Sequence, residues 1–174
     1  MDRNEIRIAG NGGQGLILGA HILFRALSLD GRRAAQSQSY EPTSRGGFCY
    51  SDVIMTEDAS DYPLVTTLDM VVALAQVGVD RSLALVKPNA LIIVDEKYVT
   101  APPQGGFQLH KLPISERAAA IGSSRIANII ALGVLARISG ICRKESLEQA
   151  VRMEAPEKFH DLNLAAVHEG FLLH

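Results

Sequence analysis

Residues 5–15 read EIRIAGNGGQG. The first five alternate between charged and apolar side chains until Ala9, which is the pattern of a β-strand. The next six are rich in glycine. Leu16, Ala20 and Leu23 then recur at helical spacing, and Gly31 suits the position just past a helix end. A strand, a tight turn and a helix in this order predict the opening unit of a layered α/β fold.

Short apolar runs alternate with helical segments along the rest of the chain. We expect strands at residues 34–39, 48–55, 70–74, 90–94 and 107–112, a turn at 88–89, and helices at 80–86, 125–138 (capped by Ser124), 147–153 and 162–172. The pattern predicts α/β class: residues 1–174 as a single three-layer α/β/α domain with a mostly parallel sheet and a Rossmann-like opening β-loop-α. We allow the edge strand near residue 107 to run antiparallel.

The charge balance excludes several classes of partner. Lys and Arg total 17 and Asp and Glu total 19, a net charge of −2 with no basic block, so we expect no nucleic-acid partner. The absence of Trp argues against a platform for stacked bases. No run of 18 apolar residues occurs and no signal peptide is recognisable, so we expect no membrane partner and a cytoplasmic location.

Self-contained catalysis is not expected either. The two cysteines, Cys49 and Cys142, are far apart in sequence, whereas an iron–sulfur cluster takes about four thiolates. The five histidines show no compact metal-ligand spacing, and no Ser or Cys stands beside a recognisable base. We therefore expect no catalytic residue, no metal ligand and no cofactor bound by this chain alone.

The glycine-rich segment at residues 10–15 matches the GxGxxG pattern of dinucleotide-binding loops. That interpretation also requires an acidic residue at the end of the second strand, to hold the ribose. Here residues 36–40 read QSQSY, and the next acid, Glu41, stands beside Pro42. Three interpretations stay open: NAD(P) binding, a structural turn, and contact with another ligand or a subunit.

A second polar segment, QSQSYEPTSRGG, occupies residues 36–47. Arg45 offers a planar fork for phosphate or carboxylate, and Gly46 with Gly47 permits close backbone approach; the alternative is a solvated loop. Both loops follow strands whose carboxyl ends should lie at one edge of the sheet. The candidate ligand-binding residues at that edge are Gly12, Gly13, Gln14, Tyr40, Ser44, Arg45 and Gly46.

Seven segments together carry a family resemblance. They are GNGGQG at 10–15, SYEPTSRGG at 39–47, SDVI at 51–54, DYPLV at 61–65, LDMVVAL at 68–74, NIIALG at 128–133 and NLAA at 163–166. In this combination the chain resembles the γ subunit of the 2-oxoacid:ferredoxin oxidoreductases, from about residue 6 to residue 170. The glycine loop alone is weakly specific; its pairing with SYEPTSRGG is much more so.

The resemblance implies a reaction for a larger enzyme. These enzymes convert a 2-oxoacid, coenzyme A and oxidised ferredoxin to an acyl-CoA, CO2 and reduced ferredoxin. Thiamine diphosphate sits on the α and β subunits and iron–sulfur clusters carry the electrons, while the γ subunit packs on the coenzyme A side of the active site. The implied partners are α and β subunits, a ferredoxin-like subunit, and coenzyme A at the shared interface.

The resemblance leaves the 2-oxoacid open. Glu41 stands where many relatives have Gly after the Tyr, and the Glu form is associated more with the 2-oxoglutarate-type branch. Related domains also occur in indolepyruvate oxidoreductases. Two other functions remain as alternatives. One is a free-standing Rossmann-type NAD(P)-binding protein, and the other is an assembly subunit without any ligand contact.

Overall fold

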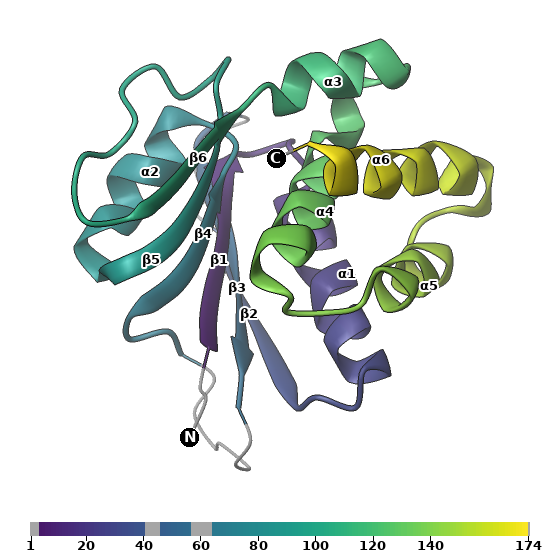
Figure 1. Ribbon diagram of the computed structural model, residues 1–174, viewed down its shortest axis with the longest axis horizontal. Coiled ribbons are helices and arrows are strands. Elements are labelled where there is room, and N and C mark those ends of the chain that lie inside the picture. The colour runs from purple at the N-terminus through teal and green to yellow at the C-terminus, as the bar shows by residue number, and fades with distance from the viewer. Residues whose placement is uncertain (1–3, 41–45, 57–63, 174) are drawn as a thin grey trace.

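The computed structural model describes residues 4–40, 46–56 and 64–173. Its six strands form one sheet in the order β2-β3-β1-β4-β5-β6 (Figure 1). Their bounds are β1 (Asn4–Asn11), β2 (Ala34–Tyr40), β3 (Phe48–Met55), β4 (Leu68–Ala73), β5 (Val86–Asp95) and β6 (Gln108–Leu112). Neighbours from β1 through β4 and β5 to β6 are parallel, and β3 runs antiparallel to both β1 and β2. The expected mostly parallel sheet is confirmed.

Helices cover both faces of this sheet (Figure 1). They are α1 (Leu16–Leu29), α2 (Gln76–Ser82), α3 (Ile114–Ile121), α4 (Ala127–Ser139), α5 (Lys144–Glu154) and α6 (His160–Leu172), with short 3-10 turns η1 (Leu83–Leu85), η2 (Ser124–Ile126) and η3 (Glu157–Phe159). On one face α1 and α4 lie against the sheet, with α5 packed outside α1 and α6 outside α4. On the other face α2 lies over β1 and β4. The three-layer α/β/α architecture is therefore confirmed.

The two faces bury apolar cores of different size. The larger core joins β1, β3 and β4 to α1, α4 and the outer helices. The smaller core, beneath α2, centres on Val71, Val79, Ile92 and Val94. Gly78 lets α2 approach the end of β1, because a Cβ there would lie 2.9 Å from the Ala9 carbonyl carbon.

Three local expectations were wrong. The helix expected at 80–86 begins earlier, as α2 and η1, and residue 86 already belongs to β5. The expected turn at 88–89 lies inside β5, where Asn89 has φ 63° and donates its N–H to the Gly106 carbonyl, so the turn is a bulge in a continuing strand. The edge strand near residue 107 is parallel, and the antiparallel strand is β3, inside the sheet.

The start of the C-terminal helical region also differs from expectation. Ser123 rather than Ser124 provides the cap, since its hydroxyl accepts from the Arg125 N–H, and a 3-10 turn precedes α4. The sequence pattern did not indicate α3, because this helix spans only eight residues. It begins directly after Pro113, and the Asp95 carboxylate at the end of β5 accepts from the Ser115 hydroxyl in its first turn.

A carboxylate just after the end of α1 holds the start of α5. Asp30, just after α1, accepts from the Arg143 N–H (2.8 Å), the Arg143 Nε (2.7 Å) and the Ser146 hydroxyl (2.5 Å). Burial by itself would raise the pKa of Asp30, but the hydrogen bonds from Ser146 and Arg143 and the Arg143 charge outweigh it, so this pKa lies below its ordinary value. The N-terminus of α5, which has no side-chain cap of its own, is thus capped from another helix.

Two glycines let α4 and α6 cross in close contact. A Cβ at Gly133 would lie 2.7 Å from the Val167 carbonyl oxygen, and one at Gly170 would overlap the Ile130 carbonyl oxygen and lie 2.8 Å from the Gly133 Cα. Contacts this short involve backbone atoms that cannot rotate away. Each position therefore accepts only glycine at this crossing.

We predict that Gly170→Ala destabilises the protein. In an unobstructed helix a change from glycine to alanine would stabilise the protein by about 1 kcal/mol. A loss of stability would therefore indicate that the new Cβ collides with α4. We expect a loss of about 1–3 kcal/mol in the free energy of unfolding, measured by urea denaturation, because α6 must move off α4. The control is Gly106→Ala, whose Cβ would meet no atom within 4 Å. A Gly170→Ala protein more stable than the parent would contradict the close crossing.

Candidate ligand- and partner-binding edge

The glycine loop and the loop before β3 meet at one edge of the sheet. Strands β1 and β2 both run antiparallel to β3, so their carboxyl ends lie at the same edge. There the Gly12 N–H donates to the Gly47 carbonyl oxygen at 2.8 Å. Asn11 pairs with Phe48, the first residue of β3, so the hydrogen bond continues the β1–β3 ladder by one step. Two of the seven segments that carry the family resemblance, GNGGQG and SYEPTSRGG, are thus joined through their backbones.

The described part of the candidate site is mostly backbone. Gly12 and Gly13 are exposed, and Gly13 adopts φ 96° with open space around the position of a Cβ. Gly46, also exposed, has φ 103°. Tyr40 ends β2 and its backbone pairs with Cys49. The remaining candidates, Ser44 and Arg45, lie outside the described residues.

Gln14 folds back into the loop that contains it. Its Oε1 accepts from the Asn11 N–H at 2.7 Å, and its Nε2 donates to the Leu74 carbonyl oxygen at 2.9 Å. Leu74 is the first residue after β4, so this one side chain bridges the carboxyl ends of β1 and β4. Gly10 leaves the necessary space, because a Cβ there would overlap Gln14 Oε1.

The gap between β1 and β4 is the topological switch point of the sheet. The connection through α1 lies on one face and the connection through α2 on the other, and open α/β sheets usually bind ligands where this change occurs. Here Gln14 occupies the gap between the two strand ends. The first glycine of the GxGxxG pattern therefore makes room for a side chain of the same chain.

The strand order also differs from that of a dinucleotide-binding sheet. In that fold the second strand lies beside the first, and an acidic residue at its carboxyl end binds the ribose. In this protein β3 separates β1 from β2 and runs in the opposite direction, so its carboxyl end at Met55 lies at the far edge. The geometry therefore supplies no ribose-binding acid beside the glycine loop within the described residues.

Asn128 attaches the larger helical layer to the same loop. It lies in the first turn of α4 and donates through Nδ2 to the Gly15 carbonyl oxygen at 2.8 Å. Gly15 has φ 71°, and a Cβ there would lie 2.7 Å from Asn128 Nδ2. The helices α1 and α4 thus begin side by side at the edge. We assigned no role to Asn128 from the sequence; a buried polar residue within the apolar run NIIALG was the available signal.

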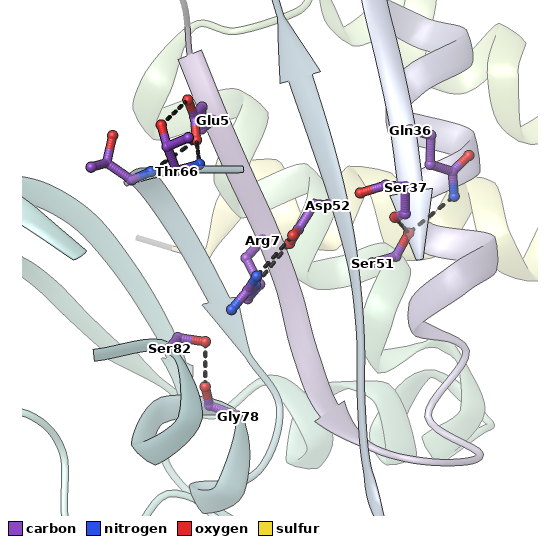
Figure 2. Close-up of polar contacts among 10 residues, drawn as sticks. Glu5, Arg7, Gln36, Ser37, Ser51, Asp52, Thr66, Gly78 and Ser82 are labelled. Carbon is purple, nitrogen blue, oxygen red and sulfur yellow. Dashed lines mark hydrogen bonds and ion pairs between the residues drawn. The ribbon is translucent and has the colours of Figure 1, made fainter. Parts of the chain in front are cut away.

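A buried ion pair holds β3 beside β1 (Figure 2). The Arg7 guanidinium donates from Nε and Nη2 to the two Asp52 carboxylate oxygens, each at 2.8 Å. The Tyr50 ring stacks on the Arg7 guanidinium, with its centroid 4.0 Å from Arg7 Cζ, and both charged residues are at most 5% exposed. Burial raises the pKa of Asp52, against the lowering effect of Arg7. The sequence signal that was missed is a charged residue within an otherwise buried strand.

Two further polar networks are visible on the same strands (Figure 2). Glu5 accepts from the backbone N–H groups of Thr66 and Thr67, at 2.6 and 3.0 Å, which fixes the approach to β4. On the opposite face the Ser51 hydroxyl donates to the Ser37 carbonyl oxygen at 2.9 Å and accepts from Gln36 at 3.1 Å. These contacts stabilise the pairing of the strands. None of them involves the exposed Gly12, Gly13 or Gly46.

The described residues contain no group of three or more His, Cys, Asp or Glu that could hold a metal ion. Burial raises the pKa of the Cys49 thiol and, with the nearby Asp30 charge and against that of Arg32, raises the pKa of Cys142 to about 12. Both thiols are thus far from the thiolate form that metals and nucleophilic catalysis use. Within the described part of the chain, no helix is long and apolar enough to cross a membrane.

The fold and its loop edge define an open-sheet α/β domain in which backbone groups of two glycine-containing loops face outward. The chain belongs to the pyruvate ferredoxin/flavodoxin oxidoreductase family, whose model matches residues 5–173. This membership confirms the resemblance inferred from the seven sequence segments.

Three individual proteins show what the chain is similar to within and around this family. The chain is 37% identical to the 2-oxoglutarate synthase subunit KorC of Methanocaldococcus jannaschii, over 97% of this chain and 92% of that protein. It is 31% identical to the ketoisovalerate oxidoreductase subunit VorA of Methanothermobacter thermautotrophicus, over 95% of this chain and 35% of the relative. Among solved structures, the keto/oxoacid ferredoxin oxidoreductase γ subunit from Geobacter sulfurreducens is 41% identical and superposes with a TM-score of 0.88, covering 99% of this chain and 96% of that one.

We predict that Asp52→Ala strongly destabilises the fold, because it leaves the Arg7 guanidinium buried without its partner. The expected loss is about 3–5 kcal/mol in the free energy of unfolding, measured by urea denaturation at neutral pH. The matched control is the double variant Arg7→Met/Asp52→Leu, which removes both charges and should lose much less. A single variant that loses less than the double variant would contradict this account of the pair.

Proposed function

We propose that this chain is the γ subunit of a multi-subunit 2-oxoacid:ferredoxin oxidoreductase. The observation that carries the proposal is similarity along nearly the whole chain, at 37% and 41% identity, to a KorC subunit and to a γ subunit of known structure. The complete enzyme would convert a 2-oxoacid and coenzyme A to an acyl-CoA and CO2, passing two electrons to ferredoxin. Residues 1–174 would contribute one γ-type domain to that complex.

The redox cofactors would lie on other subunits. The sequence holds two cysteines, fewer than the roughly four thiolates of an iron–sulfur cluster, and both have raised pKa values. The residues of this chain therefore do not fit a cluster, and the described residues contain no group of three or more His, Cys, Asp or Glu that could hold a metal ion. Its contribution would be to complete and shape an active site formed with α and β subunits, beside a ferredoxin-like subunit.

Coenzyme A at the shared interface is the ligand that best suits the loop edge. No side chain caps the N-terminus of α1. The first N–H groups of a helix have no partner within the helix, so such an end favours an anion such as a phosphate. The exposed Gly12, Gly13 and Gly46 permit close backbone approach. Tyr40, Ser44 and Arg45 would add hydroxyl groups and a guanidinium fork, while Gln14 would hold the loop in place.

We propose 2-oxoglutarate as the substrate of the complex. Four relatives between 32% and 37% identical are named as 2-oxoglutarate synthase subunits, each over at least 96% of this chain. Ketoisovalerate is the second candidate, supported by two subunits that are 28% and 31% identical. We further place the complex in the cytoplasm, where reducing conditions keep Cys49 and Cys142 as free thiols.

The free-standing NAD(P) protein is disfavoured by two observations. Gln14 fills the gap between β1 and β4, and β3 separates β1 from β2. An assembly subunit without ligand contact would share the same fold. The hypothesis of an assembly subunit differs from our proposal in one expectation. It predicts that substitutions in the two loops alter the stability of the complex and never its apparent affinity for coenzyme A.

We predict that the isolated chain neither oxidises 2-oxoacids nor shows cluster absorbance, and that tagged chain purified from its host brings α and β oxidoreductase subunits with it. The purified complex should oxidise 2-oxoglutarate in a coenzyme A-dependent manner, with kcat/KM at least about tenfold above that for 2-oxoisovalerate or pyruvate. NADH or NADPH titrated into the isolated chain should show no saturable fluorescence change at micromolar concentration. Coenzyme A-dependent turnover by this chain alone, or micromolar NAD(P)H binding, would overturn the proposal.

A second prediction concerns Arg45. A hydrogen bond to a charged group contributes roughly 1.5–3 kcal/mol, so Arg45→Ala in the complete complex should raise the KM for coenzyme A by about one to two powers of ten. The control is Arg152→Ala, an exposed arginine on α5. An intact complex with raised KM supports a ligand contact, and a dissociated complex on a sizing column would indicate a salt bridge to a partner. Unchanged kinetics and assembly would mean that Arg45 is merely solvated.

A further inference from the structure

Hydrogen bonds hold the glycine loop on two sides, through backbone atoms on one side and through a side chain on the other. Toward β3, the Gly12 N–H donates to a backbone carbonyl, that of Gly47. Toward β4, the contact is made by the Gln14 side chain, which spans from the Asn11 N–H to the Leu74 carbonyl oxygen. Between these supports the exposed Gly12 and Gly13 project from the edge.

The geometry points to Gln14 as a positioning residue: by closing the switch point between β1 and β4, it holds the Gly12–Gly13 peptide outward for the ligand of the complex. Both polar atoms of its carboxamide are used within the chain, at 2.7 and 2.9 Å, and the side chain is half-buried. It acts through the loop backbone and need not touch the ligand. This inference refines the role of Gln14 and, for its kinetic test, rests on the proposed function.

The residues around Gln14 fit this role. Gly10 provides the space that the carboxamide fills, since any Cβ at that position would overlap Oε1. Gly13 adopts φ 96°, a backbone conformation that L side chains rarely adopt, and the Gln14 N–H donates to the Asn11 carbonyl at 3.2 Å to close the turn. With the carboxamide removed, the Asn11 N–H and the Leu74 carbonyl lose their partner, and the support toward β4 is lost while the support from Gly47 remains.

The chemistry of the carboxamide allows a graded test. Glutamate at position 14 keeps an acceptor for the Asn11 N–H but cannot donate to the Leu74 carbonyl oxygen, whereas alanine loses both hydrogen bonds. In the purified complex, Gln14→Ala should raise the KM for coenzyme A by about five- to tenfold, the factor that loss of ordinary hydrogen bonds predicts. Gln14→Glu should fall between Gln14→Ala and the parent, and kcat should change less than about twofold in both.

Gln76→Ala is the matched control. Gln76 also bonds a neighbouring backbone segment at the carboxyl edge, through its Oε1 to the Ala101 N–H and its Nε2 to the Ala101 carbonyl, both at 2.9 Å. It holds the segment after β5 and touches neither loop of the candidate edge in the contacts described above. We expect it to leave the coenzyme A KM unchanged. An equal rise in both variants would assign the effect to general loosening of the edge and overturn the inference.

A second measurement keeps the inference testable apart from the enzyme. In the isolated chain, backbone amide exchange followed by NMR should accelerate at Asn11 in Gln14→Ala and stay slow along β5, and Gln76→Ala should leave Asn11 unchanged. Unchanged Asn11 exchange, unchanged coenzyme A KM in an active complex, or dissociation of the complex would each overturn the positioning role. A parent complex without coenzyme A-dependent turnover would instead count against the proposed function, and the exchange data alone would then decide the role of Gln14.

Discussion

The buried Arg7–Asp52 ion pair is the contact on which the arrangement of the edge depends. Antiparallel β3 lies between two strands that run the other way, and its register against β1 decides where the following glycines fall. A slip of one residue would turn Asp52 to the opposite face, away from Arg7, and leave two charges buried without partners. The bidentate geometry under the Tyr50 ring therefore fixes one register, and in that register Gly47 meets Gly12.

Once the register is fixed, the carboxyl edge of the sheet is closed largely by amides of the chain itself. Gln14 joins β1 to β4, Gln76 holds the segment after β5, and Asn128 joins α4 to the glycine loop. The hydrogen bonds of Gln14 and Asn128 are partly buried, which strengthens them and makes an unpaired partner costly, whereas those of Gln76 are exposed. Among the described residues of the two loops, Gly12, Gly13 and Gly46 are the exposed ones, and they present backbone groups.

Much of the fold follows from local patterns, because strand and helix periods are properties of neighbouring residues. The strand expected at 48–55 and the long apolar helix expected at 125–138 were recognised within two residues of their ends. The position of β3 in the sheet was not predicted. Strand order depends on pairings between distant residues, such as Asn11 with Phe48, and local patterns do not indicate these pairings. The two polar loops were expected at one edge and do meet there, but the inward fold of Gln14 depends on the Leu74 carbonyl, supplied by a strand far along the chain.

The insertion of β3 bears on how the chain reaches its native state. In most open sheets the two parallel strands of a β1–α1–β2 unit pair directly with each other. Here β1 and β2 do not pair, and each pairs with β3, which lies between them. The two paired strands closest in sequence are β2 and β3, which only residues 41–47 separate. The entropic cost of bringing them together is therefore the smallest in the sheet. Hairpin formation before docking on β1 is then the kinetically favoured route, with the Arg7–Asp52 pair desolvated only in the docking step. The β2–β3 hairpin would thus serve as a folding nucleus for this half of the sheet.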